Sequence, residues 1–143
     1  MGGLSLADIR ITPLTRITTS GGDVMHAMKA GDPGYEGFGE AYFSWVEQGA
    51  VKAWKRHFRM TMNLVVPVGC VRIVFALASD GPFREIKIGA QADYVRLSVP
   101  PGIWFGFQGC ATGPSLLLNL ANIVHDPEEA QRAELKEFDF DWS

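Results

Sequence analysis

The sequence lacks most of the features that would take a chain out of the class of ordinary globular domains. No apolar stretch approaches the roughly 18 residues that a membrane-spanning helix needs. The first ten residues, MGGLSLADIR, contain no apolar core of the length found in secretory signal peptides. Charged residues make up 20% of the chain and the net charge is −3, so no basic field attracts nucleic acid or anionic lipid. We therefore expect a cytoplasmic protein without a nucleic-acid or membrane partner.

Cysteine is also scarce. Cys70 and Cys110 are the two cysteines of the chain, and neither has the CxxC spacing typical of metal or redox sites. Isolated cysteines of cytosolic proteins are usually reduced. We expect two free thiols and no cysteine-bound metal.

The sequence is rich in short, alternating apolar runs separated by turn residues. Its 143 residues, 47% of them hydrophobic, fit one domain covering 1–143 with a substantial core. The run at 116–124 fits a helix or a strand by periodicity, and we interpret it as a strand because so many short strands precede it. The expected strands cover residues 4–12, 24–29, 38–46, 50–58, 62–68, 71–78, 83–88, 94–99, 103–107 and 116–124. This pattern predicts an all-β sandwich or barrel.

The acidic C-terminal stretch differs from the rest of the chain. Asp126 followed by Pro127 is a typical helix start, so we expect a short surface helix over residues 128–136, or an irregular tail. The side chains of residues 128–137 are expected to be solvated.

The stretch from Gly49 to Gly69 carries the residues of greatest chemical interest. Lys55 and His57 are two residues apart, so in a strand they point to the same side, while Trp54 and its alternate neighbours point to the other. If the strand register is shifted by one residue, both basic side chains face solvent instead.

The spacing of this stretch resembles the first motif of the cupin superfamily, G-x5-H-x-H-x4-E-x6-G. Between Gly49 and Gly69 the ligand positions hold Lys55, His57 and Met62. Pro100, Gly102 and Phe105 similarly resemble the second motif, P-x-G-x2-H. The resemblance implies a double-stranded β-helix, or jelly roll. Since lysine, methionine and phenylalanine are not the usual ligands of zinc, iron or manganese, it implies no metal.

Four segments are more specific, and through them the chain resembles the dTDP-4-dehydrorhamnose 3,5-epimerase family, in particular its short members. They are GFGEAYFSWVEQGAVKAWKRH, VPPGIWFGFQG, LLLNLANIVHDPEEA and FDFDW. The resemblance implies a cofactor-free, metal-independent epimerase or isomerase that acts on a nucleotide-activated keto-sugar in deoxysugar or cell-surface polysaccharide biosynthesis. An alternative is a cupin module that has lost catalysis and only binds a sugar nucleotide or a partner.

Enzymes of that family use a histidine base, a lysine, a tyrosine acid and a carboxylate behind the histidine. In this chain Lys55 aligns with the histidine base, and the supporting carboxylate lies in a C-terminal extension that the chain lacks. Lys55 made neutral by burial could abstract a proton, or charged Lys55 could hold a phosphate or enolate while His57 is the base. His125 is the candidate acid.

Candidate substrate-binding residues complete the set. Arg72 either lines the barrel or faces solvent, and its alternation does not decide between them. Asn63 and Asn119 could bind a ligand or satisfy the backbone. The full set is Lys52, Asn63, Arg72, Trp104, Phe105 and Asn119. The resemblance also implies a homodimer, in which the edge strand Leu4 to Thr12 is suited to exchange between protomers.

Overall fold

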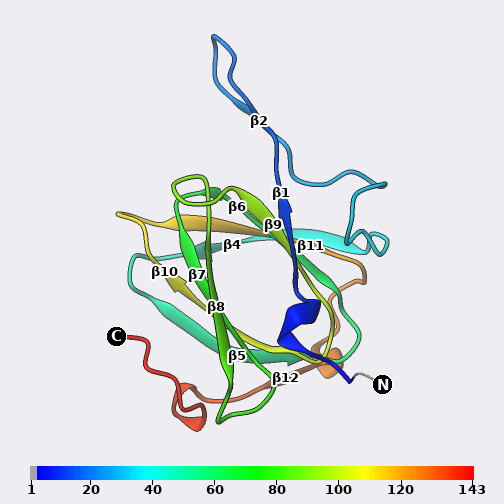
Figure 1. The fold of residues 1–143 in the computed structure, drawn as a ribbon, viewed down its shortest axis with the longest axis vertical. Helices are drawn as coiled ribbons and strands as arrows, with labels where there is room; N and C mark the ends of the chain where they lie inside the picture. The colour runs from blue at the N-terminus through cyan, green and yellow to red at the C-terminus, as the bar shows by residue number, and fades with distance from the viewer. Residues whose placement is uncertain (1–2) are drawn as a thin grey trace.

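The computed structural model describes residues 3–143, which form two antiparallel sheets facing each other. The first sheet has the order β1–β9–β6–β11–β4 and the second β12–β5–β10–β7–β8 (Figure 1). In chain order the strands are β1 (Arg10–Pro13), β2 (Arg16–Ile17), β3 (Val24–Met25), β4 (Glu40–Val46), β5 (Val51–His57), β6 (Met62–Val68), β7 (Val71–Ala76), β8 (Phe83–Ile88), β9 (Val95–Val99), β10 (Trp104–Gly109), β11 (Ser115–Ala121) and β12 (Ala130–Arg132). The predicted all-β jelly roll of the cupin type is confirmed.

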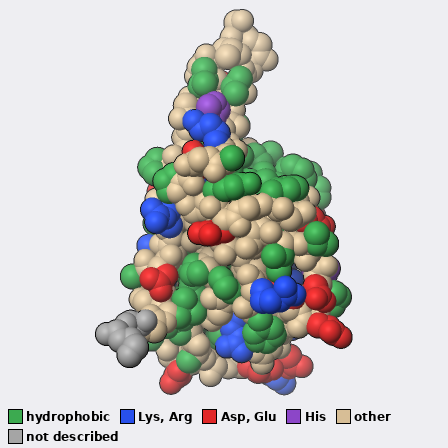
Figure 2. Space-filling view, turned by 90° about the vertical axis from the view of Figure 1, so that its right-hand side faces the viewer, with side chains coloured by type: hydrophobic (Ala, Val, Ile, Leu, Met, Phe, Trp, Pro, Cys, Tyr) green, Lys and Arg blue, Asp and Glu red, His purple; other side chains and the backbone are tan. Residues whose placement is uncertain are grey.

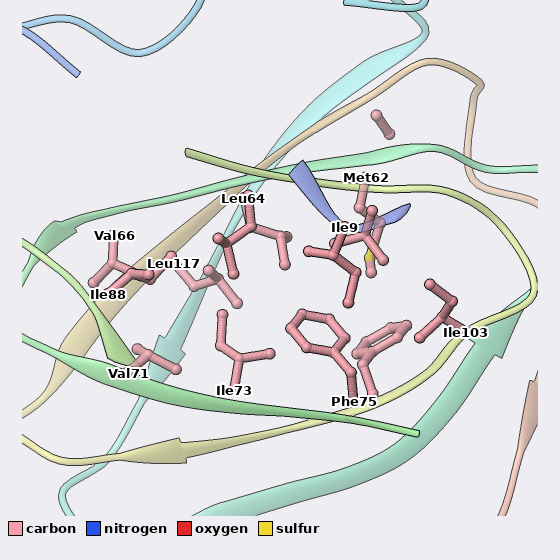
Figure 3. Close-up of a cluster of buried hydrophobic side chains, with 14 of the residues drawn as sticks. Ile9, Met62, Leu64, Val66, Val71, Ile73, Phe75, Ile88, Ile103 and Leu117 are labelled. Carbon is pink, nitrogen blue, oxygen red and sulfur yellow. The ribbon is translucent and has the colours of Figure 1, made fainter. Parts of the chain in front are cut away.

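The main core lies between the two sheets. Leu64 and Leu117 reach down from the first sheet to meet Ile73 and Phe75 from the second (Figure 3). These side chains come from alternate positions of their strands, so each sheet turns one apolar face inward. The strong alternation of the sequence therefore sets which faces meet.

A second apolar cluster covers the outer face of the second sheet. Trp54, Val74, Ala76 and Trp104 project outward from its strands, and Phe138 and Trp142 of the C-terminal segment pack against them. A second hydrophobic core therefore lies between the outer face of this sheet and the C-terminal segment.

The C-terminal segment does not form the predicted surface helix over residues 128–136. Asp126 does cap a helix, as expected, but this is the three-residue 3₁₀ helix η2 (Pro127–Glu129). The chain then pairs with β5 as strand β12, forms another 3₁₀ turn, η3 (Leu135–Glu137), and continues without regular structure to Ser143. The free edge of β5 offers backbone hydrogen bonds that the local sequence does not reveal, which is why the helix prediction was wrong. The alternative, an irregular tail, fits better.

A thin arm stands away from the sheets. It contains β2 and β3, which pair only with each other (Figure 1), and Figure 2 shows it projecting from the rounded body. The predicted strands at 4–12 and 24–29 are reduced to β1, after the 3₁₀ turn η1 (Leu6–Asp8), and to the short β3. Among residues 3–143, no helix has the length and apolar character needed to cross a membrane.

The prediction of two free thiols is wrong. Cys70 and Cys110 form a disulfide, with their Cα atoms 5.3 Å apart. The turn after β6 and the end of β10 lie side by side, and the Cys110 N–H donates to the Cys70 carbonyl at 3.0 Å. Sequence spacing could not show this because the neighbourhood is created by sheet pairing.

Candidate active site

Strand β5 presents Lys55 and His57 to the space between the sheets. Both side chains line one cavity, while Trp54 is buried in the outer cluster on the opposite face. The register of β5 against β10 shifts between Phe105 and Gly106, but the two basic residues stay on the inner side. Of the two orientations that the sequence leaves open, Lys55 and His57 therefore take the one that faces a cavity.

This inner cavity holds about 120 Å³. Polar groups on its wall include Tyr42 and Asn119, which are joined by a hydrogen bond of 3.0 Å from Asn119 Nδ2 to the tyrosine oxygen. Asn119 Oδ1 accepts from the backbone N–H of Asn63 at 3.2 Å, which fixes the amide. The complete lining is Tyr42, Ser44, Lys55, His57, Met62, Leu64, Phe105, Phe107, Leu117 and Asn119.

A carboxylate supports His57 from behind. Glu129 Oε1 lies 2.7 Å from His57 Nδ1, and both side chains are almost fully buried. The other oxygen of Glu129 accepts the backbone N–H groups of Arg59 and Met60 at 2.8 and 2.9 Å. Within residues 3–143 the Nε2 atom of His57 has no hydrogen-bond partner. The arrangement orients the imidazole and leaves one nitrogen free.

The protonation states follow from burial and from these bonds. Burial lowers the pKa of His57 below its ordinary value; the bond to Glu129 and its charge oppose the shift, while Lys55 and His125 add to it. Burial alone would raise the pKa of Glu129, but its hydrogen bonds outweigh burial and lower that pKa. At neutral pH the pair is therefore a neutral histidine that donates its Nδ1 proton to a carboxylate.

An outer cavity of about 390 Å³ adjoins the inner one and shares Ser44, Lys55, Phe105 and Phe107 with it. Its rim carries the cations Lys52 and Arg132, and its lining includes no acidic side chain. Lys52 Nζ donates to the Trp45 carbonyl at 2.5 Å. With Lys55, three cations border this space.

Lys55 joins the two cavities and is only partly exposed. Burial lowers its pKa, the neighbouring charge of Arg132 lowers it further, and Glu129 opposes the change. Arg132 lies opposite Lys55 in the ladder between β12 and β5. The Lys55 side chain makes no ion pair or hydrogen bond within residues 3–143, so its amino group is available to a ligand.

Four predicted site residues lie elsewhere. Arg72 points to the outer face of the second sheet, where its Nε donates to Glu85 Oε1 at 2.6 Å. The C-terminal segment covers that face and also accepts a hydrogen bond from Arg72. Trp104 belongs to the same outer cluster. Asn63 bonds Ser98 and the Gly34 carbonyl on the outer side of β6, and His125 is exposed in the loop after β11. Their contact with a substrate therefore has no support from the geometry, whereas Lys52, Phe105 and Asn119 do line the cavities.

Three lining or supporting residues escaped the sequence reasoning. Glu129 sits beside the exposed Glu128 in one acidic run, and no local pattern separates the two. The supporting carboxylate is thus present after all, although we expected the chain to lack it. Arg132 depends on the same β12 pairing. Tyr42 did leave a signal, because β4 alternates Tyr42 and Ser44 on one face with Phe43 and Trp45 on the other.

The four positions of the cupin ligands converge as the motif predicts. Lys55, His57, Met62 and Phe105 all line the inner cavity. Only His57 is a usual metal ligand among them, and nowhere in residues 3–143 do three or more His, Cys, Asp or Glu side chains group together as a metal would require. This set of side chains does not fit the metal of other cupins.

Comparisons with known proteins give a consistent picture. No family model matches the chain. The crystal structure of a dTDP sugar isomerase from Desulfovibrio desulfuricans G20 superposes with a TM-score of 0.88 and 34% identity, covering 94% of this chain and 90% of that one. The probable low-salt glycan biosynthesis epimerase Agl13 of Haloferax volcanii is 28% identical over 95 residues, which span 62% of this chain and 60% of that relative.

More distant structures share the fold. The sugar 3,4-ketoisomerase QdtA of Thermoanaerobacterium thermosaccharolyticum has a TM-score of 0.75 at 18% identity, over 94% of this chain and 95% of its own. The dTDP-6-deoxy-D-glucose-3,5-epimerase RmlC of Legionella pneumophila has a TM-score of 0.78 at 14% identity, over 97% and 80%. With 34% identity to the Desulfovibrio isomerase along nearly the whole chain, this protein belongs to the dTDP-4-dehydrorhamnose 3,5-epimerase family of dTDP-sugar epimerases and isomerases.

Proposed function

We propose that this protein is a metal-independent epimerase or isomerase acting on a nucleotide-activated keto-sugar, with His57 as the base. The observation that carries the proposal is the buried His57–Glu129 pair on the wall of the inner cavity. A proton beside a ketone is weakly acidic, so its removal needs a base titrating near neutrality and a partner for the enolate oxygen.

The chemistry needs only groups that line the inner cavity. His57 Nε2 accepts the proton, the C–H electron pair forms a carbon–carbon double bond, and the carbonyl oxygen becomes an enolate oxygen. The ammonium group of Lys55 stabilises that oxygen. Return of a proton to the same carbon from the opposite face gives an epimer, for which the Tyr42 hydroxyl is our candidate donor. If that carbon bears a hydroxyl, the hydroxyl proton passes to the enolate oxygen and a proton adds to the former carbonyl carbon, so that the ketone moves to the neighbouring carbon instead.

The outer cavity suits the nucleotide end of such a substrate. A diphosphate carries negative charge, and Lys52, Lys55 and Arg132 border this space without a competing carboxylate. The relatives named above act on dTDP-sugars or in glycan biosynthesis, which favours a role in deoxysugar or cell-surface polysaccharide biosynthesis.

A homodimer belongs to the same proposal. Both edge strands of the first sheet carry exposed apolar side chains: Ile11 on β1 is 44% exposed, and Phe43 and Trp45 on β4 are 62% and 55% exposed. Covering them in a second copy would remove apolar area from water. Light scattering at micromolar concentration should give the mass of a dimer, and a monomer would contradict this part of the proposal.

Incubation with dTDP-4-keto-6-deoxyglucose in heavy water tests the activity. We expect NMR to show deuterium at C3 or C5, or a new product with the ketone at C3. His57→Asn should abolish both signals. The matched control is His26→Asn, because His26 lies in the arm, outside both cavities.

The outcomes separate the candidate functions. Absence of exchange and of product in the wild type would rule out this substrate assignment. Tight binding of the sugar nucleotide without either signal would favour the alternative of a binding module that has lost catalysis.

A further inference from the structure

The C-terminal segment, residues 134–143, packs against the wall of the outer cavity from outside. Phe138 stacks on Trp54 with ring centroids 4.4 Å apart, and Trp142 lies 5.5 Å from the same indole. Phe138 and Trp142 are 6% and 8% exposed. Figure 1 shows this orange-to-red segment running beneath β5, on the side away from the first sheet.

Trp142 also presses on the backbone of β10. A Cβ atom on Gly106 would lie 2.6 Å from Ala53 Cβ and 2.9 Å from the Trp142 ring, so a side chain at this position would clash with both. Gly106 stands between Phe105 and Phe107, whose side chains line both cavities on the opposite face. The indole is therefore separated from the cavities by the thickness of one strand.

The main chain of Trp142 is fixed as well. Its carbonyl accepts from Arg72 Nη1 at 3.1 Å and from Gln108 Nε2 at 3.3 Å. The Arg72 guanidinium carbon lies 5.5 Å from the centre of the Trp142 ring. Arg72, which the sequence left between two readings, thus holds the end of the chain.

A short path leads from Trp142 to the cationic rim. Trp142 contacts the Trp54 ring, and the Trp54 backbone exchanges two hydrogen bonds with Ala133, at 3.0 and 3.1 Å. Ala133 follows Arg132, and Trp54 precedes Lys55. Strand β12 has three residues and pairs only with β5, so its own ladder gives it little support.

We propose that Trp142 is a positioning residue for the outer cavity: through Trp54 and β12 it holds Arg132 in place to bind the diphosphate of a nucleotide. The inference deepens the proposed function and rests on it. Glu129 has separate anchors in the backbone of Arg59 and Met60, so the His57–Glu129 pair does not depend on Trp142. Binding and proton transfer should therefore respond differently to a change at this residue.

Calorimetric titration with dTDP tests the proposal in the full-length protein. We expect Trp142→Ala to weaken the binding of dTDP at least tenfold. Trp142→Phe keeps an aromatic ring on Gly106, and its affinity for dTDP should stay within about threefold of the wild type. With substrate, Trp142→Ala should raise KM and change kcat little. The downfield NMR signal of the His57 Nδ1 proton should persist in Trp142→Ala. A second variant, Phe138→Leu, makes a milder change in the same cluster in case Trp142→Ala does not fold.

Two controls separate positioning from general stability. Ile88 is fully buried in the main core and lines neither cavity, so Ile88→Ala should destabilise the fold and leave dTDP affinity unchanged. In an Arg132→Met background, Trp142→Ala should cause a much smaller further loss of affinity.

The results that would overturn the proposal are distinct. Three results would overturn the proposal and leave the proposed function intact. They are unchanged dTDP affinity in folded Trp142→Ala, an equal loss of affinity in Ile88→Ala, and fully additive losses of affinity when Trp142→Ala is combined with Arg132→Met. A wild type that does not bind dTDP would instead overturn the proposed function, and this inference with it.

Discussion

Glu129 lies 2.7 Å from His57 although the two residues are 72 positions apart in the sequence. Ala130 of β12 lies opposite His57 of β5, and the backbone N–H groups of Arg59 and Met60 hold the second oxygen of Glu129. A C-terminal segment thereby supplies the carboxylate that fixes the histidine tautomer and leaves Nε2 free to act as a base.

Replacing Glu129 by glutamine should lower kcat by about a hundredfold, because an amide does not stabilise the imidazolium formed during proton transfer. The control is Glu128→Gln, which changes the exposed neighbour in the same turn. Glu129 raises the pKa of His57, so its loss should also move the acidic limb of the pH profile to lower pH. Steady-state kinetics across pH measures both effects, and equal activity of the two variants would contradict the dyad.

The rate should depend on pH through two groups. The base is active when His57 is neutral, so kcat/KM should rise with pH through a pKa below about 6.5, the ordinary value for histidine. It should fall again as Lys55 loses its proton, at a pKa below about 10.4. A bell-shaped profile in which Lys55→Met removes the alkaline limb would support these assignments; a profile that is flat from pH 5 to 10 would not.

The free energy of unfolding should depend on pH through the same histidine. The pKa of His57 is lower in the folded state, so between that value and about 6.5 the unfolded chain binds more protons. The free energy of unfolding should therefore rise with pH across this window, and His57→Asn should flatten the rise. Urea titrations at closely spaced pH values measure the slope, and a fall with pH would show that another group dominates.

Lys55→Met tests which basic residue is the base. If His57 is the base, the variant should keep a slow hydrogen–deuterium exchange, reduced tenfold or more because the enolate oxygen has lost its cation. Lys87→Met, on the exposed side of β8, is the matched control. Complete loss of exchange in Lys55→Met, with exchange surviving in His57→Asn, would assign the base to Lys55 instead.

Reduction of the Cys70–Cys110 disulfide should destabilise the fold. The bond closes a loop with a sequence separation of 40, for which chain entropy predicts about 4 kcal/mol. Urea unfolding with and without a phosphine reductant measures the difference. A protein carrying Cys70→Ser and Cys110→Ser should be insensitive to the reductant, and a wild type that is equally insensitive would contradict the prediction.

Local patterns of the sequence predicted the scaffold well. Two expected strands, 62–68 and 83–88, match β6 and β8 at both ends, because alternating apolar residues and flanking turn residues are local signals. The motif spacing also placed Lys55, His57, Met62 and Phe105 on one cavity wall.

The sequence could not predict which face of β7 Arg72 occupies. Its own-face neighbours Val74 and Ala76 are as apolar as Val71 and Ile73 on the other face, so alternation gave no orientation. The C-terminal aromatic residues decide it by covering the outer side. The sequence also placed Asn63 and Trp104 in the cavity. Both pack instead against residues that are distant in the chain, and only the folded structure brings those residues close.

The sequence alone determined most of the strands and the place of His57 in the cupin motif, since these depend on residues close together in the chain. Tertiary structure decided that Glu129 rather than Glu128 supports the histidine, that Arg132 joins the cationic rim and that the two cysteines pair. Each of these depends on strand pairing between segments far apart in the chain, and that geometry exists only once the sheets have formed.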